Sequence, residues 1–256
     1  QKRYSIAMGF GAGQTNQDTS SVAIGHEAGN LTQGANTVAV GHDAGKIRQN
    51  DYSVAIGAFA GQTDQSHNAV AIGAFAGQTD QSHNTVSIGF EAGNRKQGSK
   101  AVSIGYQAGK FRQDFSAVAI GPGAGWTDQS YNAVAVGSGA GNQNQGHSSV
   151  AVGRRAGHID QSDNSVAIGF HAGYQSQSWD AVAIGNSAGE QSQGHHSIAL
   201  GRLAGQTNQD IYSIAMGFSA GQTDQSWDAV AIGFNAGKTR QDSSAVAIGA
   251  DAGEVD

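Results

Sequence analysis

Two short strings in the sequence could carry nucleophilic chemistry. Gly185–Gly189 and Gly217–Gly221 both read G-x-S-x-G, a pattern that can hold a catalytic serine, here Ser187 or Ser219, on a sharp turn. Such a serine needs a helix after the turn and a histidine–acid pair beside it. No helical pattern follows either string, and the sequence contains no phosphate-binding loop and no H-E-x-x-H motif. The sequence therefore predicts no catalytic residue and a protein that is not an enzyme.

Histidines and aspartates are the other candidates for chemistry, as metal ligands. His67 and His83 lie 16 residues apart, but a closed zinc site needs four ligands. Calcium-binding β-rolls use a nonapeptide with paired glycines, which is absent here. We therefore interpret the histidines as solvated and assign no metal and no cofactor, with calcium at the Thr-Asp-Gln-Ser strings left as an open alternative. The aspartates of those strings are Asp64, Asp80, Asp128 and Asp224.

All of these residues belong to one sixteen-residue repeat. From Ser5 onward the pattern [SAT]-[VI]-[AS]-[IVLM]-G-x-x-A-G-x-x-x-Q-x-x-x recurs without insertion or deletion. Ser53–Asn68 and Ala69–Asn84 differ only in their first residue, and partial units stand at Gln1–Tyr4 and Ala245–Asp256. A fixed period of this kind is typical of a solenoid. The prediction is a single repeat array over 1–256, with fifteen complete units, as a segment of a longer fibre.

The first four positions of the unit predict a strand. Large apolar residues at positions 2 and 4 alternate with alanine or serine at position 3, which is the period of a β-strand. We expect valine and isoleucine to point inward, and the small residues of positions 1 and 3 to form a flat outer surface. The glycine at position 5 marks a corner, and Pro122 at position 6 places that position outside the ladder. The alanine at position 8 is expected to point inward.

The predicted fold is all-β. It is a parallel β-solenoid of sixteen coils of 16 residues, with two short strands per coil. One coil buries too little apolar surface to offset its conformational entropy, so coils must stack to be stable. The thin interior that this predicts favours further lateral packing between chains.

Glutamine at position 13 is present in every unit that reaches it. An exposed glutamine would vary, so we predict an internal ladder in which each side-chain amide donates to the next coil. A glutamine that bonds the backbone of its own turn is the alternative. The predicted ladder comprises Gln17, Gln33, Gln49, Gln65, Gln81, Gln97, Gln113, Gln129, Gln145, Gln161, Gln177, Gln193, Gln209, Gln225 and Gln241.

Aromatic residues recur at position 15 of the unit. They are candidates for surface contact, either with a neighbouring chain or with a ligand, because exposed aromatic rings are favoured at recognition surfaces. The residues singled out are Phe115, Tyr131, Trp179 and Trp227.

Composition narrows the classes of partner. Charged residues make up 13% of the chain and the net charge is −6, without the clustered positive charge that nucleic-acid binding requires. No apolar run approaches the roughly 20 residues of a membrane-spanning helix. We expect no nucleic-acid partner and no membrane span in this segment.

The string S-V-A-I-G-x-x-A, at Ser21–Ala28 and Ser165–Ala172, resembles the head repeats of YadA-type trimeric autotransporter adhesins and related phage and virus fibre repeats. The resemblance extends over the whole chain. It implies a left-handed parallel β-roll, three chains side by side, an adhesive role, and an extracellular, cell-surface or virion location. No functional residue carries over, because such heads bind through surfaces.

We therefore expect a structural or adhesive fibre or stalk segment. Its partners would be copies of itself, as a homotrimer or filament, through lateral packing and coil stacking. A host-surface protein or glycan would be bound through the exposed variable positions. The alternative is a solenoid that binds ice or another ligand on the flat Ser/Ala/Thr face. An enzyme built on a β-helix is a third class, but the array lacks the inserted loops that such enzymes use.

Overall fold

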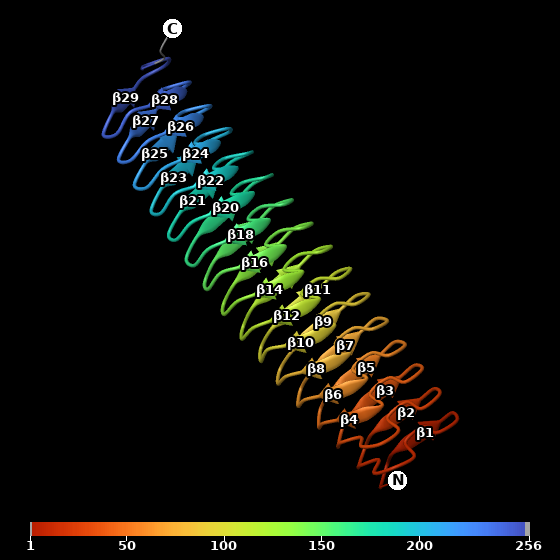
Figure 1. The fold of residues 1–256 in the computed structure, drawn as a ribbon. Coiled ribbons are helices and arrows are strands. Elements are labelled where there is room, and N and C mark those ends of the chain that lie inside the picture. Colours follow the sequence, from red (N-terminus) through yellow and green to blue (C-terminus); the bar gives the residue numbers. More distant parts are fainter. Residues whose placement is uncertain (1, 254–256) are drawn as a thin grey trace. The chain divides into compact units, whose positions relative to one another are not determined.

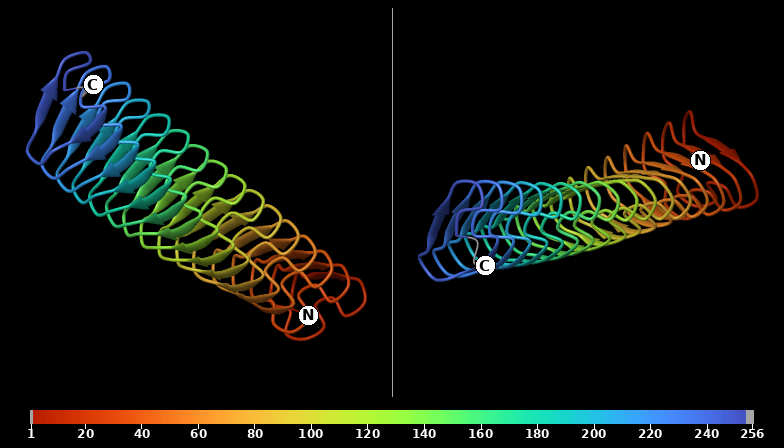
Figure 2. Two further views of the ribbon diagram at one scale, coloured as in Figure 1. Left: turned by 45° about the horizontal axis from the view of Figure 1, so that its top comes forward. Right: turned by 90° about the horizontal axis from the view of Figure 1, so that it is seen from above.

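The computed structural model describes residues 2–253, which form short parallel strands joined by turns (Figure 1). The chain divides into two compact units, Gln1–Tyr131 and Asn132–Asp256. In each unit, one 16-residue repeat makes one coil of a parallel β-solenoid, and successive coils stack (Figure 2). The predicted all-β solenoid with 16-residue coils is confirmed. Gln1, which continues the glutamine column, lies outside the described residues.

Each coil contributes one strand to a valine sheet and, from the third coil onward, one to a glutamine sheet. The valine sheet consists of the Val-Ala-Ile strands, and the glutamine sheet of strands that end on the position-13 glutamine. In the first unit the valine sheet contains, in order, β1 (Ile6–Met8), β2 (Val22–Ile24), β3 (Val38–Val40), β5 (Val54–Ile56), β7 (Val70–Ile72), β9 (Val86–Ile88), β11 (Val102–Ile104) and β13 (Val118–Ile120). Its glutamine sheet contains β4 (Ile47–Gln49), β6 (Thr63–Gln65), β8 (Thr79–Gln81), β10 (Arg95–Gln97), β12 (Phe111–Gln113) and β14 (Thr127–Gln129).

The second unit repeats this arrangement. Its valine sheet contains β15 (Val134–Val136), β17 (Val150–Val152), β19 (Val166–Ile168), β21 (Val182–Ile184), β23 (Ile198–Leu200), β25 (Ile214–Met216), β27 (Val230–Ile232) and β29 (Val246–Ile248). Its glutamine sheet contains β16 (Gln143–Gln145), β18 (Ile159–Gln161), β20 (Gln175–Gln177), β22 (Gln191–Gln193), β24 (Thr207–Gln209), β26 (Thr223–Gln225) and β28 (Thr239–Gln241).

Equivalent positions of neighbouring coils lie in register. Val54 pairs with Val70 in the valine sheet, and Gln65 pairs with Gln81 in the glutamine sheet. The main-chain ladder also continues through the turns, where the Phe59 amide donates to the His42 carbonyl at 2.8 Å. Because turns as well as strands are hydrogen-bonded to the next coil, a repeat without insertions keeps its backbone polar groups paired all the way round.

The structure reverses which side chains fill the interior. In the coil that starts at Ser53, Ser53 and the position-3 alanine Ala55 are fully buried, whereas Val54 is half-buried and Ile56 is 38% exposed. The prediction that valine and isoleucine line the interior, with a flat Ser/Ala/Thr surface outside, is therefore wrong. Strand alternation groups positions 2 and 4 on one face but does not say which face is inside. The interior is thin, and alanines with one glutamine per coil already fill it.

Other parts of the predicted coil are confirmed. The position-8 alanines, such as Ala60, are fully buried, and the turn between the two strands begins at the position-5 glycine. Pro122 lies in that turn, outside the strand. The hydroxyl of a position-1 serine donates to a main-chain carbonyl three residues earlier, as Ser165 Oγ does to Ser162 O at 2.7 Å. This contact explains why small hydroxyl residues fit the buried first position.

Glycine is required at positions 5 and 9 of the repeat for two different structural reasons. A Cβ on Gly57, at position 5, would lie 2.7 Å from the carbonyl carbon and oxygen of Gly73 in the next coil. A Cβ on Gly61, at position 9, would lie 2.7 Å from Oε1 of Gln65 in the same coil. The first column is therefore fixed by stacking of the backbones, and the second by the buried glutamine.

Three further positions hold non-glycine residues in the left-handed region. In the coil that starts at Ser53 they are Phe59, Asp64 and Asn68, with φ between 56° and 59°. Asparagine and aspartate tolerate this conformation better than other residues, which explains their frequency at positions 12 and 16. The aspartates of the Thr-Asp-Gln-Ser strings therefore have a conformational reason to be present, independent of any ion.

Candidate functional site

The glutamine column connects the two sheets of each unit. Every position-13 glutamine from Gln17 to Gln241 donates its side-chain Nε2–H to the main-chain carbonyl 11 residues earlier, at 2.7–3.2 Å. That carbonyl belongs to position 2 of the same coil, on the valine sheet. These side chains are at most 5% exposed. The column therefore acts as a row of internal braces between the sheets.

A second set of contacts runs along the column. Gln81 Nε2 donates to Gln97 Oε1 at 3.1 Å, and Gln113 Nε2 to Gln129 Oε1 at 2.8 Å. Elsewhere the chain of amides is interrupted, since the buried Oε1 atoms of Gln33 and Gln65 have no hydrogen-bond partner among the described residues. The bond within the coil is thus the regular one, and the predicted bond to the next coil is the variable one.

The two serines at position 3 join this network. Ser87 Oγ donates to Gln97 Oε1 at 2.6 Å, and Ser103 Oγ donates to Gln113 Oε1 at 2.6 Å. Both serines are fully buried. A serine is accepted in this alanine column because the position-13 glutamine oxygen of the same coil accepts the hydrogen bond from its hydroxyl group.

The outer face of each valine sheet is a regular apolar surface. It presents valine or isoleucine at position 2 and isoleucine, valine, leucine or methionine at position 4, with no charged residue in either column. Within the stacks, Ile24, Ile104 and Ile168 remain 37–38% exposed. Contiguous exposed apolar surface is a feature of protein interaction sites.

A column of stacked rings runs along the turns of the first unit. The rings of Phe59 and Phe75 lie 5.0 Å apart and 6° from parallel, and those of Phe90 and Tyr106 lie 5.6 Å apart. This column was not predicted from the sequence. The recurrence of aromatic residues at positions 6 and 7 was the available signal.

The position-15 aromatics are exposed, as a contact surface requires. Phe115 is 40%, Tyr131 51%, Trp179 59% and Trp227 50% exposed. Trp179 and Trp227 directly follow Ser178 and Ser226, which line a polar groove on the outer face of the second unit's glutamine sheet. Other residues of this groove are Ser176, Ser192, Gly194, Asn208, Asp210, Asp224 and Arg240. Serine and glycine at these positions keep the outer surface of the strands low, and Trp179 and Trp227 lie exposed in the turns that follow the strands.

Three of the four aspartates in the candidate calcium strings contact a side chain of the preceding coil. Arg48 Nη2 donates to Asp64 Oδ2 and Arg112 Nη2 lies beside Asp128 Oδ1, both at 2.6 Å. Asn208 Nδ2 donates to Asp224 Oδ1 at 2.8 Å. In residues 2–253 no group of three or more potential metal ligands includes any of the four aspartates. Calcium at these strings receives no support from the geometry.

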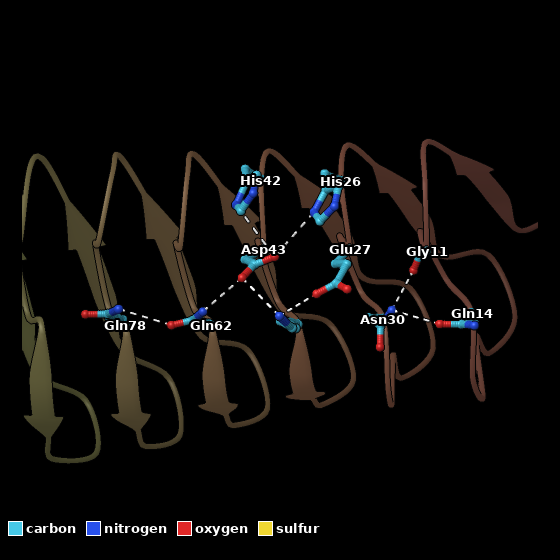
Figure 3. Close-up of polar contacts among 10 residues, drawn as sticks. Gly11, Gln14, His26, Glu27, Asn30, His42, Asp43, Gln62 and Gln78 are labelled. Carbon is cyan, nitrogen blue, oxygen red and sulfur yellow. Dashed lines mark hydrogen bonds and ion pairs between the residues drawn. The ribbon is translucent and has the colours of Figure 1, made fainter.

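Position 10 forms a polar row on the first unit (Figure 3). Asn30 Nδ2 donates to Gln14 Oε1 at 3.2 Å, and Gln78 Nε2 donates to Gln62 Oε1 at 3.1 Å. Between them Lys46 forms ion pairs with Glu27 and Asp43, and its hydrogen bond to Glu27, followed by that to Asp43, raises the pKa of Lys46. The same pairing recurs between Lys110 and Glu91, where the bond to Lys110 lowers the pKa of Glu91.

Histidines lie in three kinds of environment. His67 and His83 stack with centroids 5.6 Å apart, at the spacing of successive coils. His158 Nδ1 donates to Gly139 O at 2.7 Å, while burial lowers the pKa of His158. His26 and His42 stack 4.8 Å apart and face Asp43 (Figure 3), a juxtaposition that sequence analysis did not anticipate.

Neither serine of the G-x-S-x-G strings is exposed on a strand-to-helix turn, as the nucleophile of that motif is. Ser187 and Ser219 are 7% and 2% exposed and lie in four-residue turns that lead into strands of the glutamine sheet. The described part of the chain contains no helix long and apolar enough to cross a bilayer.

No family model matches the chain, and no curated protein matches it.

Proposed function

We propose that the chain is a structural segment of a surface fibre and associates laterally with copies of itself through the outer face of its valine sheets. The observation that carries the proposal is the uncharged Val/Ile strip, in which position-4 side chains such as Ile24, Ile104 and Ile168 stay 37–38% exposed inside the stack. Its proposed partner is a second copy of the same strip, because only a chain with the same coil spacing presents an apolar row at every rung.

The strength of the proposed association depends on the number of stacked repeats. Rungs about 4.8 Å apart and two columns about 7 Å apart give one unit's eight valine strands an apolar strip of roughly 300 Å². A stable interface buries about 800 Å² on each partner, so one short array would associate weakly. Each added repeat contributes another rung, so a long array of identical coils reaches a stable interface without any specialised residue. This fits a chain whose repeats vary at surface positions and keep positions 2 and 4 apolar.

Lysine on the valine sheet is expected to abolish association. The variant Ile168→Lys, Ile184→Lys, Leu200→Lys places three charges on neighbouring position-4 sites of the second unit. The matched control, Ser176→Lys, Ser192→Lys, Asn208→Lys, places three on the glutamine sheet of the same coils, where Lys96 shows that lysine is accepted at position 12. Sedimentation equilibrium should show oligomers for the parent and the control and monomers for the first variant. The measured mass also distinguishes dimers from the trimers that the family resemblance implies.

A parent chain that sediments as a monomer at 100 µM would refute lateral association. Equal loss of oligomers in both lysine variants would show that charge in general, rather than the valine sheet, is responsible.

We propose adhesion to a glycan as a second role, located in the polar groove of the second unit. The groove offers hydroxyl, amide and carboxylate groups that suit sugar hydroxyls. The two half-exposed tryptophans are adjacent in sequence to the groove residues Ser178 and Ser226, and exposed indole rings suit the apolar face of a sugar ring.

Removal of the two indole rings tests this role. On a glycan array, Trp179→Ala with Trp227→Ala is expected to lose at least tenfold in binding. Phe234→Ala removes a comparably exposed ring from a different position of the coil and is expected to bind as the parent does. Absence of any glycan bound by the parent, or unchanged binding by the double variant, would exclude the groove as a sugar site.

A further inference from the structure

We infer that His26, His42 and Asp43 form a binding site for a divalent transition-metal ion, with Zn²⁺ as the ion that fits the donor set. The site is distinct from the valine sheet and from the polar groove. It lies on two consecutive coils of the first unit, where the turn after the valine strand exposes both imidazoles.

The donor atoms converge on one carboxylate oxygen (Figure 3). Nδ1 of His42 lies 3.6 Å and Nδ1 of His26 lies 3.9 Å from Asp43 Oδ1. Within residues 2–253 this is the one cluster of three such side chains whose ligand atoms all lie within 4.8 Å of one another. Ligands about 2.0–2.1 Å from a tetrahedral zinc ion are roughly 3.4 Å apart. The two histidine–aspartate separations of 3.6 and 3.9 Å would therefore close by a few tenths of an ångström, whereas two donors at the 4.8 Å limit would close by about 1.4 Å.

The coil repeat aligns the two imidazoles. His26 and His42 occupy position 6 of successive coils, and their rings are 8° from parallel at 4.8 Å. Phe10 stacks on His26 at 5.5 Å, and Phe59 contacts His42 at 5.1 Å, so both rings are held within the aromatic column. Ligands fixed in this way lose little side-chain entropy when an ion binds.

Asp43 has an unused buried oxygen. The residue is 6% exposed, and its Oδ2 accepts hydrogen bonds from Lys46 Nζ at 3.1 Å and Gln62 Nε2 at 3.3 Å. Its Oδ1 has no hydrogen-bond partner and points towards the histidines. A buried carboxylate oxygen without a partner is costly, and a bound cation would satisfy it.

The local charge also favours a cation. Lys46 bridges Asp43 and Glu27, so one ammonium group faces two carboxylates and leaves one negative charge beside the imidazoles. Imidazole nitrogen with carboxylate oxygen suits zinc and its transition-metal neighbours, whereas magnesium and calcium prefer all-oxygen sites. Three protein ligands leave a fourth position for water or for a group from another molecule.

The chain contains its own control for histidine stacking. His67 and His83 form a similar pair, 5.6 Å apart and 5° from parallel, but no carboxylate of the described residues completes a three-ligand group there. If stacked imidazoles alone bound zinc, the two pairs would behave alike. The proposal requires that they differ.

Calorimetric titration of the untagged chain with ZnCl₂ tests the site. The expected result is saturable binding of one equivalent. His42→Phe and Asp43→Asn should each weaken it at least tenfold, and His83→Phe should leave it unchanged. Phenylalanine suits His26 and His42 because Phe10 and Phe90 occupy position 6 in the same aromatic column, and it suits His83 because Phe115 occupies position 15. Far-UV circular dichroism without metal checks that each variant is folded, and His26→Phe replaces Asp43→Asn if that variant is not.

Co²⁺ gives a second readout, because its visible absorption bands report nitrogen and oxygen ligation. We expect these bands in the parent and in His83→Phe, but not in His42→Phe. The proposal is overturned if the parent shows no saturable Zn²⁺ binding, if His42→Phe and His26→Phe bind as the parent does, or if Mg²⁺ competes with Zn²⁺ at equal concentration.

Discussion

Replacement of Gly137 by alanine is expected to destabilise the second unit strongly. Gly137 is a position-5 glycine with φ +127°, and a Cβ there would lie 2.6 Å from the carbonyl oxygen of Gly153 and 2.8 Å from its carbonyl carbon. The obstacle is the backbone of the next coil, which cannot rotate away as a side chain would. Backbone strain and overpacking together cost about 3–5 kcal/mol. That loss corresponds to a fall in Tm of roughly 10–20 °C.

Gly139→Ala is the matched control, two residues away in the same turn. Gly139 also has a positive φ, +64°, but the nearest atom to an added Cβ is His158 Cε1 at an ordinary 3.4 Å. Its equivalent in the next coil, Arg155, carries a long side chain at φ 56°. We therefore expect a change within about 1 kcal/mol of the parent. Urea and thermal unfolding measure both variants. Equal stability of the two would show that the stacked glycine backbones are not as close as the structure places them.

Gln177→Ala is expected to have the second largest effect. The Gln177 side chain is fully buried and donates to Val166 O at 2.8 Å and to Gln193 Oε1 at 3.1 Å. It also accepts from Gln161 Nε2 at 3.2 Å. Truncation removes the brace between the two sheets of its coil and leaves a cavity lined by unpaired amide groups. The combined cost is about 2–4 kcal/mol, from the lost packing and from the buried polar atoms left without partners.

Gln175→Ala provides the comparison, because Gln175 is the same residue type on the same strand. β20 contains both, and Gln175 is exposed while Gln177 is buried. A surface truncation of this kind changes stability by about 0.5 kcal/mol or less. Denaturant midpoints for the two variants should therefore separate clearly. If both variants unfold as the parent does, the glutamine column does not brace the sheets.

The sixteen-residue period by itself predicts much of this fold. In-register stacking requires equivalent residues at equal intervals, so the uninterrupted period indicates a solenoid. The invariant glycine at position 5 locates the corner, because only close backbone approach or a special φ keeps glycine at the same place in every coil. Invariance of glutamine indicates burial, because an exposed glutamine would be replaced freely. These predictions succeed because each rests on a requirement that every coil must meet.

The direction of the valine row was decided by the tertiary structure. The period-two pattern of Val54, Ala55 and Ile56 is the same whether alanine or isoleucine points inward. Selection between the two depends on the distance between the sheets, which the buried glutamine and its bond to the opposite carbonyl set. The thickness of the interior is a property of two packed sheets, so no single strand contains it. The same reversal buries the Ser/Ala/Thr face on which an ice-binding role would depend, and it exposes the Val/Ile face instead.

At the candidate metal site, too, one feature follows from the sequence and another only from the tertiary structure. The sixteen-residue spacing of His26 and His42 is visible in the sequence, and it predicts that their rings stack, as it does for His67 and His83. What distinguishes the two pairs is the carboxylate of Asp43, which the turn brings within 3.6–3.9 Å of both imidazoles. The sequence by itself thus determined the repeat, the corners, the buried glutamines and the alignment of equivalent residues, because these follow from periodicity along the chain. The tertiary structure alone decided which face is outside and which variable side chains meet, because both depend on the cross-section of the coil.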